Sequence, residues 1–73
     1  MRVHSTSIEY RFIHNIRVDG VPVSEVEEFD TDEGWVRYIE SDGNGYARVV
    51  RRNGKNDLNR VTVYGKVTYE VIR

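Results

Sequence analysis

Three Asn/Asp-Gly turn signals divide this chain into short runs of β-forming residues. They are Asp19-Gly20, Asp42-Gly43-Asn44-Gly45 and Asn53-Gly54. Such pairs tolerate the positive φ that tight hairpin turns require, and the runs between them are rich in Val, Ile, Tyr, Phe and Thr. The sequence therefore predicts an all-β fold, a small antiparallel meander of five or six strands curled into a barrel-like or compact sandwich fold.

Period-two alternation is clearest between Ile8 and Val18, which we expect to form one strand. After the Asp19-Gly20 turn, Pro22 places the returning strand at a sheet edge, because proline lacks a ladder N–H. The alternation then slips, which indicates either a β-bulge or a short helical turn over Ser24–Glu28. Further strands are expected over Trp35–Ser41, Tyr46–Arg52 and Val61–Ile72, with Gly65 bending or splitting the last; Asn53–Arg60 is predicted to be a flexible loop.

Residues 1–73 make a single domain, in which residues 1–7 are expected to be a flexible arm. The predicted core comprises Phe12, Ile16, Val18, Trp35, Ile39, Val49, Val63 and Val71. A core this small, without cysteine to form disulfides, supplies only about 3 to 5 kcal/mol, so we expect oligomerisation or docking on a partner. The sequence has no apolar segment of signal-peptide or membrane-spanning length, so we expect no leader peptide and no membrane association.

Charge is segregated along the chain although eleven basic and twelve acidic residues nearly cancel. The acidic segment contains Glu25, Glu27, Glu28, Asp30, Asp32 and Glu33. The basic segment contains Arg48, Arg51, Arg52, Lys55 and Arg60, interrupted by Asp57 alone. Opposite poles of this kind steer partners or pair between copies, so both segments are candidate interaction surfaces, and solvated loops of opposite sign are the plainer alternative.

No set of residues has the spacing of a catalytic or metal site. His4 lies in the expected N-terminal arm, and His14 continues an apolar strand face where a hydrogen-bonded packing role is usual. Asp30-Thr31-Asp32-Glu33-Gly34 begins like a calcium loop, but Gly34 comes one residue early and Ser41 stands where the closing acid belongs. We therefore expect neither an enzyme nor a bound cofactor, metal or small-molecule substrate.

Aromatic and arginine residues occur together around the second turn signal. Tyr38 and Tyr46 flank it, beside Arg37, Arg48, Arg51 and Arg52. This combination serves both single-stranded nucleic-acid platforms and protein interfaces. The near-neutral net charge favours a protein interface, since nucleic-acid binding depends on a surplus of positive charge.

Several segments together resemble a group of short proteins of uncharacterised function encoded by tailed bacteriophages and prophages. They are Val18-Asp19-Gly20-Val21-Pro22-Val23, Glu28-Phe29-Asp30-Thr31-Asp32-Glu33-Gly34-Trp35-Val36-Arg37-Tyr38, and Gly65-Lys66-Val67-Thr68-Tyr69-Glu70-Val71. The likeness spans residues 17–52 and 65–72, with 53–60 as a local insertion and the first ten residues outside it. It implies a viral setting, with the host bacterial cytoplasm or the virion as location, and supplies no active site.

In that setting the expected function is a non-catalytic protein-interaction module. A virion accessory protein, such as a decoration, neck or tail component, would pack through sheet edges and charged loops, with a protein partner or further copies of itself. The alternative is an inhibitor that presents an acidic or aromatic face to a host enzyme or defence complex. Single-stranded nucleic-acid binding through the arginine and tyrosine face is the third possibility.

Overall fold

Strands dominate the computed structural model, which describes residues 1–44 and 46–72 of the chain. The elements, in chain order, are β1 (Arg2–His4), the 3-10 helix η1 (Ile8–Phe12), β2 (Ile13–Val18), β3 (Val21–Pro22), β4 (Val26–Asp30), β5 (Trp35–Ile39), β6 (Val49–Arg52), β7 (Lys55–Leu58), β8 (Arg60–Tyr64) and β9 (Val67–Val71). The predicted all-β class is confirmed. The strands are shorter and more numerous than predicted, because turns and bulges interrupt the long runs of alternation.

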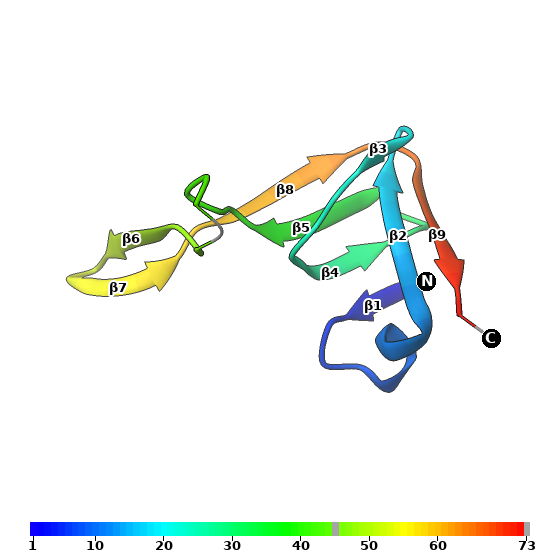
Figure 1. The fold of residues 1–73 in the computed structure, drawn as a ribbon, viewed down its shortest axis with the longest axis horizontal. Helices are drawn as coiled ribbons and strands as arrows, with labels where there is room; N and C mark the ends of the chain where they lie inside the picture. Colours follow the sequence, from blue (N-terminus) through cyan, green and yellow to red (C-terminus); the bar gives the residue numbers. More distant parts are fainter. Residues whose placement is uncertain (45, 73) are drawn as a thin grey trace.

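Two antiparallel sheets form the body of the molecule (Figure 1). The first has the order β1-β4-β5-β8 and the second the order β3-β2-β9. Gly65 and Lys66 connect β8 of the first sheet to β9 of the second, so one bent stretch of chain contributes to both. The described strands form no closed barrel, and the body is the compact sandwich that the sequence left as one of two possibilities.

The core lies between these two sheets. Its buried residues are Val3, Ile16, Val18, Val26, Phe29, Val36 and Val67. Phe29 and Val36 are fully buried and are register partners in β4 and β5. The ring of Tyr69 from the second sheet lies 5.9 Å from that of Phe29, which ties the two sheets together at the centre of the body.

Part of the predicted core is wrong. Phe12, Val49 and Val71 are each more than half exposed, and Trp35 and Ile39 are half-buried. Val63 is half-buried but packs against the core as predicted. Ile16 and Val18 are buried as predicted. Alternation along a strand identifies its two faces but does not say which face a second sheet covers.

The N-terminal segment also differs from the prediction. The sequence predicts a flexible arm over residues 1–7, but β1 pairs antiparallel with β4, in register Val3 to Phe29, and Val3 is 2% exposed. This short strand covers one edge of the first sheet. Three residues contain too little alternation for a sequence pattern to mark them as a strand.

The expected long strand from Ile8 to Val18 is divided. Ile8–Phe12 forms η1, and only Ile13–Val18 continues as β2. In a 3-10 helix residues three apart share a face, and Tyr10 and Ile13 both pack against the core while Ile8 and Phe12 are exposed. The hydroxyl of Tyr10 donates a hydrogen bond to the carbonyl of Val26 at 3.2 Å, which fixes η1 against β4.

Turn chemistry follows the sequence closely. Asp19 and Gly20 have φ of 51° and 81° between β2 and β3, and Asn53 and Gly54 have φ of 50° and 75° between β6 and β7. Two successive positive φ values characterise the hairpin turns that Asn/Asp-Gly pairs favour. The turn predicted over Asp42–Asn44 lies between β5 and β6, while Gly45 lies outside the described residues.

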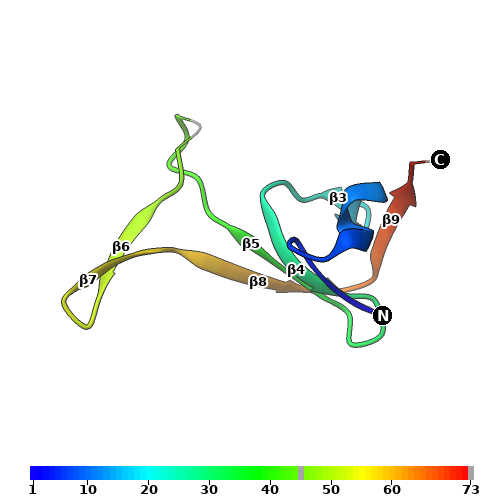
Figure 2. The same ribbon diagram turned by 90° about the horizontal axis from the view of Figure 1, so that it is seen from below.

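The predicted loop Asn53–Arg60 is instead the second half of a hairpin. Lys55–Leu58 forms β7, which pairs with β6 in a separate two-stranded sheet. Figures 1 and 2 show this hairpin projecting from the body along the long axis of the molecule, whose extents are 41 × 23 × 23 Å. We call β6 and β7 with their connecting turn, residues 49–58, the arm.

Candidate interaction surfaces

The acidic and basic segments of the sequence do not form two opposite poles, because β4, β5 and β8 of the first sheet bring parts of them together. Arg37 on β5 forms ion pairs with Glu27, at 3.1 Å, and with Glu28 on β4. Arg60 at the start of β8 reaches the other oxygen of Glu27 at 2.7 Å, and Arg2 lies 3.3 Å from Glu28. Predicted site residues Glu27, Glu28, Arg37 and Arg60 therefore neutralise one another within the chain.

This cluster of ion pairs is partly shielded from solvent. The side chains of Glu27 and Glu28 are 16% and 13% exposed. The hydrogen bond from Arg60, followed by the contributions of both arginines' charges and of the Arg37 hydrogen bond, lowers the pKa of Glu27 against the opposing effect of burial. The arginines also cover Trp35, since the guanidinium carbons of Arg2 and Arg37 lie 5.4 and 5.6 Å from its ring centre.

The acidic turn after β4 satisfies its own backbone. A carboxylate oxygen of Asp30, a residue 8% exposed, accepts hydrogen bonds from the N–H groups of Asp32 and Glu33 at 2.8 and 2.9 Å. These bonds lower the pKa of Asp30, with the Glu33 bond as the largest cause. The N-terminal ammonium group pairs with Asp32 and lies 3.9 Å from Asp30. The Asp30 carboxylate therefore accepts hydrogen bonds from the backbone of its own turn, whereas in a calcium loop it would coordinate the cation.

The histidines and carboxylates do not gather into a metal site. Among the described residues, no group of three or more His, Asp or Glu side chains is placed to hold a metal ion. His4 is engaged locally, with Nδ1 2.8 Å from the hydroxyl oxygen of Thr6, and His14 is exposed on β2. Within residues 1–44 and 46–72, no helix has the length and apolar character needed to cross a membrane.

The arm carries the remaining predicted basic residues. Arg48 lies at its root and pairs with Glu40 at 2.6 Å. In the arm itself, Arg52 lies directly opposite Lys55, and Arg51 opposite Asn56. Arg52 donates a hydrogen bond to the side-chain oxygen of Asn59 at 3.1 Å. No ion pair to Arg51, Arg52 or Lys55 occurs among the described residues. Arg52 is directed toward Asn59 and its charge acts on Asp57, so Arg51 and Lys55 are the cations of the arm tip without a counter-charge.

Apolar side chains occupy the base of the arm. Val49 lies opposite Leu58 in the β6–β7 register, and Val50 is their neighbour on the other face. Val49 is 59% exposed, and neither body sheet has a strand paired with the arm. An isolated two-stranded hairpin is marginally stable in water, so the arm is an element that gains stability when another surface covers it.

The two predicted surface tyrosines, Tyr38 and Tyr46, do not lie on one face of the molecule together with the arginines. Tyr46 is 74% exposed and precedes β6, whereas Tyr38 is half-buried in β5. Arg37 is adjacent to Tyr38 in the strand, so its side chain leaves the opposite face of the sheet. The structure therefore brings together the cations of the arm tip, but not the combined aromatic and arginine platform expected from the sequence.

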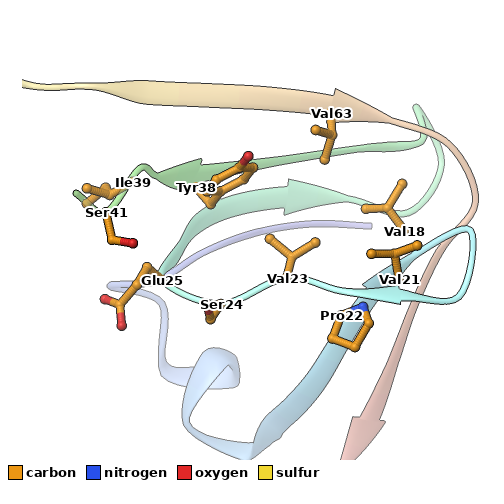
Figure 3. A pocket seen from close by; sticks show the side chains of 10 residues that line it. All are labelled: Val18, Val21, Pro22, Val23, Ser24, Glu25, Tyr38, Ile39, Ser41 and Val63. Carbon is orange, nitrogen blue, oxygen red and sulfur yellow. The ribbon is translucent and has the colours of Figure 1, made fainter. Parts of the chain in front are cut away.

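A groove that the sequence did not predict runs beside the root of the arm. It has a volume of about 380 Å³. Its lining is Val18, Val21, Pro22, Val23, Ser24, Glu25, Tyr38, Ile39, Ser41 and Val63. Figure 3 shows Glu25 and Ser41 at one end, Val21 and Pro22 at the other, and the Tyr38 ring between them. We call it the β3–β5 groove.

Glu25 is held at the mouth of this groove by the backbone. Its carbonyl accepts a hydrogen bond from the N–H of Ile39 at 3.0 Å, and its φ is 59°. The carboxylate is exposed and makes no ion pair with any described residue. The slip in alternation after Val23 was the only sequence signal here. In the structure, this slip corresponds to irregular backbone over Ser24 and Glu25 and to a bulge between Val26 and Glu28. The short helical turn that the sequence allowed over Ser24–Glu28 does not form.

A second hollow, of about 330 Å³, lies between η1 and β9. Its lining is Met1, Ile8, Glu9, Phe12, Ile13, Tyr69 and Val71. Ile8, Phe12 and Val71 are each more than half exposed, so this end of the molecule also presents apolar surface.

Comparison with protein-family models, with curated proteins and with solved structures found no match to this chain.

Proposed function

We propose that this chain is a non-catalytic protein-interaction module that engages its partner through the arm. The observation that carries the proposal is the combination found in residues 49–58: a ribbon outside the body sheets, with the exposed Val49 and the half-buried Val50 and Leu58 at its base, and uncompensated cations at its tip. A separate two-stranded ribbon, apolar surface in water and unpaired cations each lower the stability of a single molecule. A partner that covers the arm would compensate for all three.

The arrangement of the body speaks against the inhibitor alternative. The ion pairs around Glu27 and Glu28 and the shielded Asp30 turn stabilise the sandwich, so most of the acidic segment is engaged internally. That leaves little of the unbalanced acidic surface that a nucleic-acid mimic would present to a host enzyme. The resemblance to short phage proteins supports the narrower proposal of a virion accessory protein, such as a decoration, neck or tail component.

A charge reversal at the arm tip tests whether the arm binds the partner. In an Arg51→Glu/Arg52→Glu variant, the body should keep its fold, because both side chains are exposed and make no contact with the core. We expect the variant to lose binding when the tagged chain is co-expressed with the genes that flank its own and the bound proteins are recovered. A Lys66→Glu variant, altered on the body, is the matched control.

Recovery of the same bound proteins by the arm variant and by the wild-type chain would overturn the arm as the binding element. The identity of the neighbouring genes tests the virion role separately: capsid and terminase genes support it, and early regulatory genes favour the inhibitor.

Nucleic-acid binding is a second candidate, favoured by one observation. The arm is a two-stranded ribbon with three cations at its tip, and ribbons of this width fit the major groove of DNA. This candidate predicts a gel shift with duplex or single-stranded probes that weakens steeply as salt rises and is absent in the Arg51→Glu/Arg52→Glu variant. Unshifted probes at low salt would dismiss it.

A further inference from the structure

We propose that the partner of the arm is a second copy of this chain, and that the arm tip of each copy occupies the β3–β5 groove of the other. This inference rests on the proposed function and names the partner. It is carried by charges that form no ion pair among the described residues: Arg51 and Lys55 at the arm tip, and the carboxylate of Glu25 at the groove.

The arm tip requires a negative charge. Arg52 and Lys55 are direct cross-strand partners beside the turn, and like charges at directly opposed positions destabilise an antiparallel pair. Asp57 is the one acid in the arm, and it is held by Arg60 at 3.2 Å and by the N–H of Leu58 at 2.8 Å. The charge of Arg52 also acts on Asp57, which leaves Lys55 without a counter-charge. An external carboxylate near Lys55 would remove the repulsion.

The groove offers that carboxylate with a suitable apolar wall. Glu25 lies exposed at one end, and Val21, Pro22, Val23 and Val63 line the rest. Val21 is 64% exposed, so the wall is open to a ligand. Lysine and arginine side chains bury their methylene stems on apolar surface while keeping the charged head at a polar edge. The groove is therefore chemically matched to a long cationic side chain.

The geometry allows both copies to make this contact at once. The groove ends at Ser41, whose bridge to Ala47 lies at the root of the arm, and the arm extends away from that point. If the tip of one arm reaches the groove of a second copy, a two-fold axis returns the tip of the second arm to the first groove. The two ribbons then lie antiparallel, each tip beside the other's root.

This arrangement also covers the apolar base of the arm. Val49 and Leu58 form a cross-strand pair at the base of the arm, where the tip of the other ribbon would lie, and Val50 is on the opposite face of the ribbon. A two-fold contact uses the same patch on both copies and closes after two. The prediction is thus a dimer, rather than an open chain of copies.

Charge reversal on each side of the contact provides the test, read by sedimentation velocity of the purified chain. The wild-type chain should be a dimer that dissociates with rising salt. Glu25→Lys alone and Lys55→Glu alone should each shift the chain to monomer, because each places like charges at both contacts of the dimer. Glu33→Lys and Lys66→Glu, which change exposed charges elsewhere on the body, should leave the dimer intact.

Mixing the two monomeric variants separates charge pairing from misfolding. An equimolar mixture of Glu25→Lys and Lys55→Glu chains should form dimers. At one contact the lysine introduced in the groove meets the glutamate introduced on the arm, and at the other contact the native pair remains. A wild-type chain that stays monomeric at the highest attainable concentration would overturn the inference, and so would a mixture that stays monomeric.

The outcomes also distinguish this inference from the proposed function. If the Arg51→Glu/Arg52→Glu variant loses a different bound protein while Glu25→Lys retains it, the arm is an interaction element but the groove of a second copy is not its receptor. If Lys55→Glu abolishes a duplex gel shift while Glu25→Lys leaves it unchanged in a monomeric chain, the anion at the arm is phosphate and the inference fails.

Discussion

At the scale of single residues, carboxylates organise the turns and ladders of this protein. Asp30 accepts two backbone hydrogen bonds in the turn after β4, and Glu27 is held between Arg37 and Arg60. Both groups have a pKa below the ordinary value of their residue type. A carboxylate whose pKa is lower in the folded than in the unfolded state stabilises the fold most above its unfolded pKa.

Acidification should therefore destabilise the fold. The unfolded pKa of Asp and Glu is about 4, so the contribution of Asp30 and Glu27 is present at neutral pH and is lost as pH falls from about 4 through their folded pKa. We expect the urea midpoint to fall across this range. Asp30→Asn, which keeps an acceptor oxygen but cannot titrate, should flatten the dependence. An Asp30→Asn curve identical to that of the wild type would contradict the assignment.

At the scale of elements, the N-terminal strand and the arm behave differently from each other. β1 is only three residues long, yet it supplies a core residue and occupies a sheet edge. The arm is a longer paired element but adds no residue to the buried core cluster. Contribution to stability therefore follows contact with the core rather than strand length.

Truncation of a β1 side chain tests this contrast. Val3→Ala should lower the free energy of unfolding by about 2 kcal/mol, because it opens space beside Phe29 in a core with little room to adjust. Lys55→Glu in the arm, measured in dilute solution, should change it by less than about 0.5 kcal/mol. Urea unfolding followed by tryptophan fluorescence reports both values, since Trp35 is the single tryptophan. Equal effects of the two substitutions would show that β1 is not docked.

At the scale of the whole molecule, two small sheets share one thin core. Seven of the described residues form the buried cluster, and Phe29 lies at its centre with no exposed surface. A core of this size supplies only about 3 to 5 kcal/mol of net stability. The molecule therefore has little reserve, and an interface that binds only the folded state would add to it.

Removing the aromatic ring of Phe29 should cost about as much free energy as the whole fold has available. Phe29→Ala costs about 3 to 5 kcal/mol in typical cores, which equals the stability available, so we expect a largely unfolded chain at room temperature by circular dichroism. Phe12→Ala, at an aromatic position that is 51% exposed, should leave a folded protein. A cooperative, wild-type thermal transition in Phe29→Ala would contradict the single-core description.

Local sequence determined the features that depend on neighbouring residues. The all-β class, the turns at Asp19-Gly20 and Asn53-Gly54, the edge position of Pro22 and the bend at Gly65 all follow from φ preferences and period-two patterning. These properties are set within a few residues of chain, because steric limits on φ and the pleat of a strand act at that range.

Only the tertiary structure decided which faces are covered and which charges meet. Phe12 and Val49 fit the apolar alternation of their segments, yet no second layer covers them. Val3 is buried because β1 pairs with β4, a strand distant in the sequence. In the same way, Glu27 and Arg60 are far apart in sequence, but their side chains meet across β5 in the first sheet. Lys55 and Glu25 lack any such partner in the described chain. Burial and ion pairing depend on long-range strand order, which the pattern of a single strand does not contain.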